Sequence, residues 1–327
     1  MEQINAFPIS IRLPLTLKDC RLIQGHYDIP LLWRHYLLFY GGYSYVKTTF
    51  GTSAVEGLKM RTSGFSTQAS MRYNIPLPPN SSFLHEFTFG FDFKRTNNNL
   101  EFVENIPIIA KLANTTQFMA GYNLGYEIKP LTTSFEIEGF WSPTDWVADQ
   151  SAENYGSLRP YARAYYLYFR STFSATWRFW KDFSVFNALC GQFSNRNLLP
   201  SEEYGVGGYN TVRGYKERAI NGDNAFIWNF ELRTPPVRLV DGLTRNRFKS
   251  FPDEFQFLVF FDLGWAGVHK TSEFEPRSQH AISFGPGIRY NITPYINFRA
   301  DYGQQLHSIS HHGGPHHRLH FSLVAGY

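Results

Sequence analysis

Strict alternation of apolar and polar residues, repeated along almost the whole chain, is the feature that most constrains the fold. Between residues 83 and 93, aromatic rings stand at Phe83, Phe87, Phe89, Phe91 and Phe93, while the even positions from 86 to 92 are Glu, Thr, Gly and Asp. Side chains of a β-strand point to opposite faces in turn, so a period of two residues indicates a strand with one apolar and one polar face.

The same alternation predicts about twelve strands from residue 34 onward. Each segment is close to or longer than the roughly 9–11 residues that a tilted strand needs to cross a bilayer. Strands of soluble sheets average only about 5–6 residues. Two weaker segments, 5–13 and 18–30, precede the clear ones. The clear segments are 34–47, 62–77, 83–95, 114–127, 130–142, 162–178, 182–195, 224–236, 255–268, 280–291, 294–306 and 318–327.

Connections between these segments alternate in length when the chain is followed back from its last residue. Outer-membrane barrels have short periplasmic turns and long extracellular loops, so the long connections are predicted to be extracellular. Twelve or fourteen strands would then place both ends of the chain on the periplasmic side. Only 237–254 breaks the pattern, as a long connection on the short side. The short connections are 78–82, 129–130, 181–182 and 291–294, and the long ones are 49–61, 96–113, 143–161, 196–223, 269–279 and 307–317.

Composition separates a membrane barrel from a soluble one. The mean hydropathy of −0.32 is an average over alternating faces, and it conceals a continuous apolar surface. Aromatic residues make up 18% of the chain, more than the interior of a soluble up-and-down barrel could hold. No run of about 18 apolar residues is present, which argues against a transmembrane helix.

We therefore predict an all-β protein: a transmembrane, antiparallel, up-and-down β-barrel of about 12–16 strands that contacts the lipid bilayer. The barrel covers residues 34–327. Residues 1–33 are an N-terminal segment, either uncertain first strands or a periplasmic lead-in. A net charge of +4, dispersed along the chain, argues against nucleic acid as a partner. Cys20 and Cys190 are far apart in sequence, and we expect them to be unpaired.

Four ordered motifs in the second half of the chain resemble the BamA/TamA/FhaC superfamily, which comprises outer-membrane assembly factors and two-partner secretion transporters. The resemblance covers the chain after about residue 60 and is weaker before it. The matching stretches are Gly207-Gly208 with Val212-Arg213-Gly214-Tyr215 ahead of a strand containing Glu231-Leu232, then Phe261-Asp262-Leu263-Gly264, Ser283–Tyr290 and Arg299–Gly303.

The resemblance implies that the long loop 196–223 folds inward and brings Arg213 into the barrel. By the alternation, Asp262 and Gly264 lie on the luminal face of one strand, and Gly285, Gly287 and Arg289 on that of the next. A buried carboxylate needs a partner, and a guanidinium can bind it through two hydrogen bonds. We expect Arg213 to pair with Asp262 and the glycines to admit the loop close to the wall. The alternative is that Arg213 is a solvated loop residue.

The chain also departs from the resembled family. That family normally has periplasmic POTRA domains ahead of the barrel and usually sixteen strands, and neither is visible in this sequence. Either the N-terminal part was removed or this is a reduced member, and client capture, which the family assigns to POTRA domains, is in doubt for this chain. The resemblance places the protein in a bacterial-type outer membrane, or in an equivalent organelle outer envelope.

A histidine-rich stretch at 307–320 is the remaining unusual feature. Closely spaced imidazoles can bind Zn or Cu, but the stretch falls on the last predicted extracellular loop, and we interpret it as a polar surface loop rather than a metal site. It holds six of the 11 histidines, namely His307, His311, His312, His316, His317 and His320.

Two functions of different classes follow. The first is a translocase or insertase that passes client polypeptides across the outer membrane or inserts them into it. The alternative is a passive, pore-forming or structural barrel. An enzyme is not expected, because no nucleophile motif is present and Ser201 and His317 are the only, poor candidates for a barrel phospholipase. No cofactor is expected.

Overall fold

A computed structural model describes residues 9–12, 20–51, 59–79, 82–102, 107–239, 253–273, 275–293, 295–309 and 316–326. Within these ranges, fourteen antiparallel strands form one sheet in which neighbours in sequence pair with each other. The sheet consists of β1 (Ile9–Arg12), β2 (Cys20–Pro30), β3 (Tyr36–Gly51), β4 (Lys59–Pro76), β5 (Phe83–Phe102), β6 (Pro107–Ile128), β7 (Leu131–Ser142), β8 (Tyr166–Arg178), β9 (Ser184–Ser194), β12 (Asn224–Arg233), β13 (Asp253–Gly267), β14 (Ser278–Ile292), β15 (Ile296–Gln305) and β16 (His317–Ala325).

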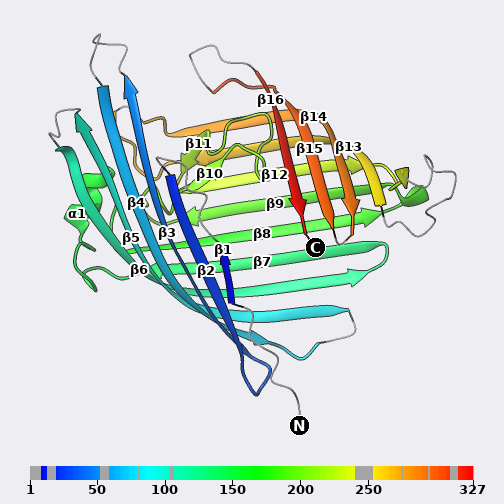
Figure 1. Cartoon of the computed structure of the whole chain (residues 1–327), viewed down its shortest axis with the longest axis horizontal. Helices are drawn as coiled ribbons and strands as arrows, with labels where there is room; N and C mark the ends of the chain where they lie inside the picture. Colours follow the sequence, from blue (N-terminus) through cyan, green and yellow to red (C-terminus); the bar gives the residue numbers. More distant parts are fainter. Residues whose placement is uncertain are drawn as a thin grey trace.

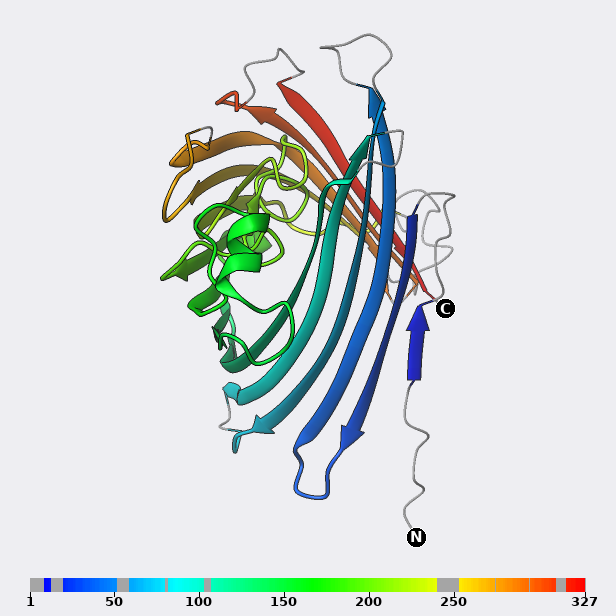
Figure 2. The same cartoon turned by 90° about the vertical axis from the view of Figure 1, so that its left-hand side faces the viewer.

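The sheet coils into a barrel around a loop and a short helix. A separate two-stranded sheet, β10 (Tyr204–Val206) with β11 (Ile220–Gly222), lies inside the curve of the large sheet (Figure 1). Helix α1 (Ala152–Leu158) lies within one opening of the barrel (Figure 2). Among the described residues, the edge strand β16 pairs only with β15 and the other edge strand β1 only with β2. Up-and-down barrel architecture is confirmed, with a strand count inside the predicted range.

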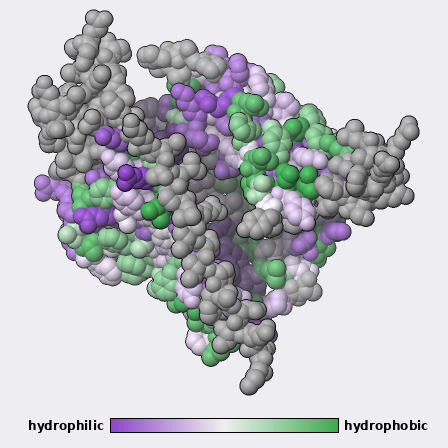
Figure 3. Space-filling view, viewed as in Figure 1, coloured by the Kyte–Doolittle hydropathy of each residue, from purple (hydrophilic) through white to green (hydrophobic). Residues whose placement is uncertain are grey.

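The two faces of the sheet divide as the alternation predicted. Phe83, Phe87 and Phe89 on β5 are 39–49% exposed on the outer surface, where lipid replaces water, whereas Asp92 on the other face of the same strand is buried. Hydrophilic residues line the hollow at the centre of the view, and hydrophobic residues gather towards its outer side (Figure 3). Within the described ranges, no helix has the length and apolar character required to cross a bilayer.

Two predicted loops are largely strand. The segment 96–113 was expected to be a long loop, but β5 continues to Phe102 and β6 begins at Pro107. Likewise, β3 reaches Gly51 and β4 begins at Lys59, which shortens the predicted loop 49–61. Thr96-Asn97-Asn98-Asn99 is polar at consecutive positions, so the apolar alternation stops there while the hydrogen-bonded ladder continues. The alternation of apolar and polar residues arises because one face of each strand contacts lipid. Where a strand extends beyond the bilayer, the alternation is therefore lost.

The other strand boundaries lie closer to those predicted from the sequence. The strand predicted at 162–178 begins at Tyr166, and the long connection before it holds α1, which the sequence did not predict and which Ser151 caps. Strands β1 and β2 pair into the same sheet, which therefore starts before the predicted boundary at residue 34. In the unusual connection 237–254, residues 240–252 lie outside the described ranges. Cys20 and Cys190 are free, as expected.

Candidate functional site

The loop 196–223, which we call the inner loop, joins β9 to β12 and folds into the barrel. Its β10–β11 hairpin pairs Tyr204 with Gly222 and Val206 with Ile220. The turn between these strands uses Gly207, Gly208 and Gly214 at positive φ angles of 105°, 115° and 89°. Side chains other than glycine rarely adopt this backbone conformation, so the predicted loop glycines are required by the shape of the turn.

Arg213, at the tip of the inner loop, binds Asp262 of β13 through three hydrogen bonds. Its main-chain N–H and its Nε donate to Oδ2 over 3.0 and 2.7 Å, and Nη2 donates to Oδ1 over 2.7 Å. Nη1 donates to Oε1 of Glu231 on β12 over 2.5 Å. The guanidinium carbon also lies 3.6 Å from the centre of the Phe260 ring. Arg213 is 2% exposed and Asp262 0%, so the pair is almost completely dehydrated.

Further charges from the last strands surround this pair. Glu231 also accepts from Arg233 and from Arg289, over 2.6 and 3.3 Å. Asp301 of β15 accepts from Arg289 over 2.8 Å and from Arg299 over 2.6 Å. Four guanidinium groups thus meet three carboxylates, a formal net charge of +1. We call this group the luminal charge cluster: Arg213, Arg233, Arg289, Arg299, Asp262, Glu231 and Asp301.

Every carboxylate of the cluster therefore has a cationic partner. Burial alone would lower the pKa of Arg213, but its hydrogen bond to Asp262 and the negative charges of Asp262, Glu231 and Asp301 outweigh burial and raise the pKa above its usual value. The guanidinium stays charged, and the loop tip is held by charge-assisted bonds rather than by apolar packing.

Glycines in the wall let the tip reach the sheet. A Cβ atom at Gly264 would lie 2.5 Å from Cγ1 of Val206 and 2.6 Å from Cγ2 of Val212, so this glycine admits the inner loop as predicted. Gly285 and Gly287, which were also expected to admit the inner loop, do not contact it. Added Cβ atoms there would meet residues of the wall, and none of their three nearest contacts belongs to the inner loop.

Gly214 rests on the backbone of β15 and is bonded by both last strands. Its carbonyl accepts from Nε2 of Gln305 over 2.6 Å, and its N–H donates to Nε2 of His320 on β16 over 3.0 Å. A Cβ atom at Gly303 would lie 2.8 Å from the carbonyl carbon of Arg213. The hydroxyl of Tyr215, the last residue of the motif, lies 2.9 and 2.5 Å from the carbonyl oxygens of Ile282 and His307, to which its one hydrogen can be donated, and it accepts from the N–H of Ile282 over 3.1 Å.

A second anchor holds the inner loop on the opposite wall. Glu202 is completely buried, and both its oxygens accept from Nζ of Lys94 on β5, over 2.9 and 3.0 Å. The hydroxyl of Tyr168 on β8 donates to Oε2 of Glu202 over 2.9 Å. Burial would raise the pKa of Glu202, but the neighbouring charge and hydrogen bond of Lys94 lower it below its usual value. The inner loop therefore crosses the lumen from the β5–β8 wall to the β12–β16 wall.

A third anchor joins three connections at one end of the barrel. Arg159, just after α1, binds Asp223 over 2.6 Å, Glu203 over 2.9 Å and Glu275 over 3.2 Å. Asp223 is completely buried and also accepts from the backbone N–H of His269 over 2.9 Å. We call Arg159, Asp223, Glu203 and Glu275 the Arg159 cluster. It ties the inner loop to the connections that precede β8 and β14.

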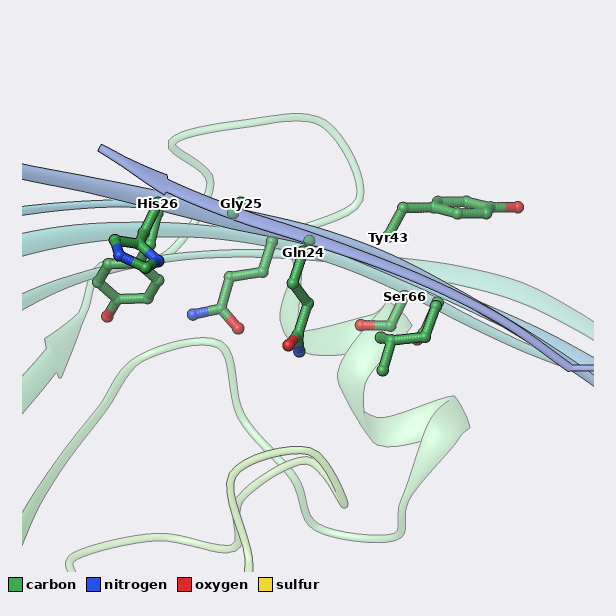
Figure 4. Close-up of a pocket in the computed structure, with 11 residues that line it drawn as sticks. Gln24, Gly25, His26, Tyr43 and Ser66 are labelled. Atoms are coloured by element: carbon green, nitrogen blue, oxygen red, sulfur yellow. The ribbon is translucent and has the colours of Figure 1, made fainter. Parts of the chain in front are cut away.

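The luminal wall formed by β2–β4 lacks such an anchor in the part of the chain that the structure describes. A groove of about 480 Å³ runs along it, lined by uncharged polar groups and glycines such as Gln24, Gln68, Ser44 and Ser66. Gln24 and His26 point from β2 into the lumen, whereas Tyr43 points the opposite way (Figure 4). A second space of about 380 Å³ continues between Ser44 and Ser66 and the inner loop at 199–201.

The histidine-rich stretch does not behave as one surface loop. His320 lies on β16, inside the predicted strand 318–327 and not in the surface loop to which the whole histidine-rich stretch was assigned. It is 8% exposed because its imidazole faces the loop tip in the lumen. The ring of His317 stacks on that of Tyr302 instead. His311 and His312 lie outside the described residues. Among those that are described, no three His, Cys, Asp or Glu side chains are grouped so that they could hold a metal ion.

Sequence reasoning found Arg213, Asp262 and Arg289, which the structure brings into one cluster, but missed several anchoring residues. Lys94 and Glu202 are 108 positions apart, and no motif marks either one. The only signal available for His320 was the alternation, which places it on the same face of β16 as Ser322. The two former enzyme candidates make separate structural contacts: the Ser201 hydroxyl donates to Glu202, and His317 contacts Tyr302.

Comparison with known proteins identifies the family. The family model of the haemolysin secretion/activation proteins ShlB/FhaC/HecB matches residues 17–290. The chain belongs to this family. The resemblance expected from the four motifs is thus confirmed, and the chain is an integral outer-membrane β-barrel protein. A search of curated protein sequences finds no significant match.

Solved structures share the fold at low sequence identity. CdiB from Escherichia coli matches with a TM-score of 0.75 and 15% identity, over 93% of this chain and 52% of that one. CdiB from Acinetobacter baumannii matches with a TM-score of 0.66 and 16% identity, over 93% of this chain and 50% of that one. BamA from Haemophilus ducreyi lacking POTRA domains 1–3 matches with a TM-score of 0.56 and 13% identity, over 94% of this chain and 63% of that one. The chain spans about half the length of the CdiB chains.

Proposed function

We propose that this chain is the barrel of an outer-membrane translocase that secretes a client polypeptide. The family to which it belongs is described by haemolysin secretion and activation, which favours secretion over insertion of barrels into the membrane. Transport of this kind needs no covalent step and no cofactor.

The observation that carries this proposal is the way in which the inner loop crosses the lumen. The inner loop is held by an ion pair on each side, Lys94–Glu202 on one wall and Arg213–Asp262 on the other. Ion pairs and hydrogen bonds can be exchanged for water or for polar groups of another chain, and bistable elements of this kind serve as gates. A passive pore has no need of a loop that is bonded so extensively to opposite walls.

The β2–β4 wall offers the path for the client. The groove is lined mainly by amides, hydroxyls and glycines, and the space beside the inner loop adds apolar side chains such as Leu158 and Leu199; Asp, Glu, Lys and Arg are absent from both linings. Such a surface exchanges hydrogen bonds with an extended backbone without holding any one side chain tightly. We therefore place the client between the inner loop and β2–β4, and displacement of the inner loop widens this passage.

Deleting the gene in the native bacterium and comparing culture supernatants by mass spectrometry tests this function. We expect one or a few large polypeptides to disappear from the supernatant and to accumulate in the periplasm, with recovery on complementation. Abundance of other outer-membrane barrels should stay unchanged. A general loss of those barrels would instead identify an insertase, and an unchanged supernatant with altered solute permeability would identify a passive pore.

A further inference from the structure

Within the described residues, the hydrogen bond that joins the tip of the inner loop to the edge strand β16 comes from the side chain of His320. Both peptide groups of Gly214 are used: its carbonyl binds Gln305 of β15 and its N–H binds Nε2 of His320 on β16. The imidazole is buried, with 8% of the residue exposed. Because Gly214 follows Arg213 directly, this bond fixes the position of the residue that enters the luminal charge cluster.

The bond has a specific protonation requirement. Nε2 accepts a hydrogen bond only when it carries no proton, so the contact requires the neutral imidazole with its hydrogen on Nδ1. In the protonated form both ring nitrogens are donors, and Nε2–H would face the N–H of Gly214. Protonation would therefore convert an attractive contact into a repulsive one.

Burial of His320 disfavours a positive charge on its imidazole. Arg299 on β15 and Arg318 on β16 also oppose such a charge, whereas Asp301 on β15 and Glu217 from the inner loop favour it. The ring of Tyr209 packs near the imidazole, with ring centres 6.5 Å apart. The luminal charge cluster beyond Gly214 already has a net charge of +1, so an imidazolium beside it would add a second net positive charge.

We propose that His320 is a positioning residue whose neutral imidazole holds the tip of the inner loop on the last strand, and that protonation releases the tip. The release lengthens the distance between the turn at residues 209–211 and β15–β16, and it loosens the seat of Arg213 without breaking any covalent bond. This inference rests on the proposed role of the inner loop as a gate. Its test measures only loop position, so that it can fail while secretion is still observed.

Pulsed electron paramagnetic resonance measures that distance directly. Cys20 and Cys190, both free, are replaced by serine, and spin labels are placed at Asn210 in the turn and at the exposed Leu323 on β16. The full chain is studied in lipid at about pH 7.5 and about pH 5, a range that imidazole titration spans. We expect one short distance at the higher pH and a second, longer distance that appears reversibly at the lower pH.

Variants separate the imidazole from the other titratable groups. His320→Gln supplies a neutral Oε1 acceptor and should keep the short distance at both pH values, whereas His320→Ala should show the longer distance at both. His317→Gln, on the same strand with its ring on Tyr302, is the matched control and should respond to pH as the unmodified chain does. A pH response that survives in His320→Gln would assign it to the carboxylates and overturn the proposal. So would a His320→Ala variant that keeps the short distance.

Discussion

Arg213 and Asp262 meet in the lumen through three hydrogen bonds, one of them from the main-chain N–H of Arg213. The backbone and the side chain of the same residue thus bind one carboxylate, and this fixes both the position and the orientation of the loop tip. Two parallel bonds from a planar fork, at Nε and Nη2, match the geometry of a carboxylate in a way that an ammonium group cannot.

Replacing Arg213 by Ala should release the loop tip and lower stability, but the barrel should still fold. Removing one partner of a buried pair costs about 3–5 kcal/mol, because Asp262 and Glu231 are then left with less compensation for their charge. Arg213→Lys should recover little of this loss, since it cannot bond both oxygens of Asp262 in the same way. Thermal unfolding in lipid, followed by circular dichroism, measures the effect.

The control is Lys216→Ala, which removes an exposed cation from the same loop. Secretion should fail in Arg213→Ala and persist in this control. Equal unfolding temperatures for Arg213→Ala and the unmodified chain would show that the cluster does not stabilise the folded state.

Gly264→Ala should displace the inner loop by a steric effect alone. The added methyl group would lie within 2.6 Å of side-chain carbons of both Val206 and Val212, and overpacking of this kind costs about 1–3 kcal/mol. Gly125→Ala is the matched control, because its methyl group would meet only the Leu84 carbonyl oxygen, at an ordinary 3.8 Å. Unfolding temperature compares the two variants, and equal losses in both would exclude a specific contact at Gly264.

Much of the barrel and part of the site followed from the sequence because the alternation of residues records which side chains face lipid. It placed Asp262 and Arg289 in the lumen, and the motif around Arg213 supplied the partner of Asp262. Alternation also misled where strands leave the bilayer, as at Asn97, because water on both faces removes the pattern while the ladder of hydrogen bonds persists.

The anchors that the sequence did not reveal depend on how the barrel closes around the loop. Lys94 and Glu202 are adjacent only because the inner loop folds back through the lumen to reach β5. In the sequence, a glutamate between Ser201 and Glu203 is indistinguishable from a surface residue. Phe260 lies on the luminal face, where the alternation predicts a polar side chain. The guanidinium of Arg213 packs on the Phe260 ring and stabilises the aromatic side chain in the lumen. This contact exists only once the inner loop has folded.

The Glu202 anchor should weaken in acid. The pKa of Glu202 is lowered in the folded protein from a usual value of 4.5, so its contribution to stability is present above that pH and is lost as the pH falls through the folded-state pKa. Glu202→Gln should be less stable than the unmodified chain at neutral pH. The two proteins should converge as the pH falls below the folded-state pKa of Glu202, which lies under its usual value. Thermal unfolding against pH tests this, and parallel curves at all pH values would exclude an ionised Glu202.

The end of the barrel that carries α1 should face the outside of the cell. The connections before β8, β12 and β14 gather at this end through the Arg159 cluster, and long connections are extracellular in barrels of this class. With both native cysteines replaced, a cysteine at the exposed Thr144 should react with a membrane-impermeant maleimide on whole cells. A cysteine at the exposed Glu127, beside the short turn at 129–130, should react only after the outer membrane is permeabilised. Labelling of intact cells at Glu127 but not at Thr144 would reverse the orientation, and with it the direction in which a client passes the inner loop.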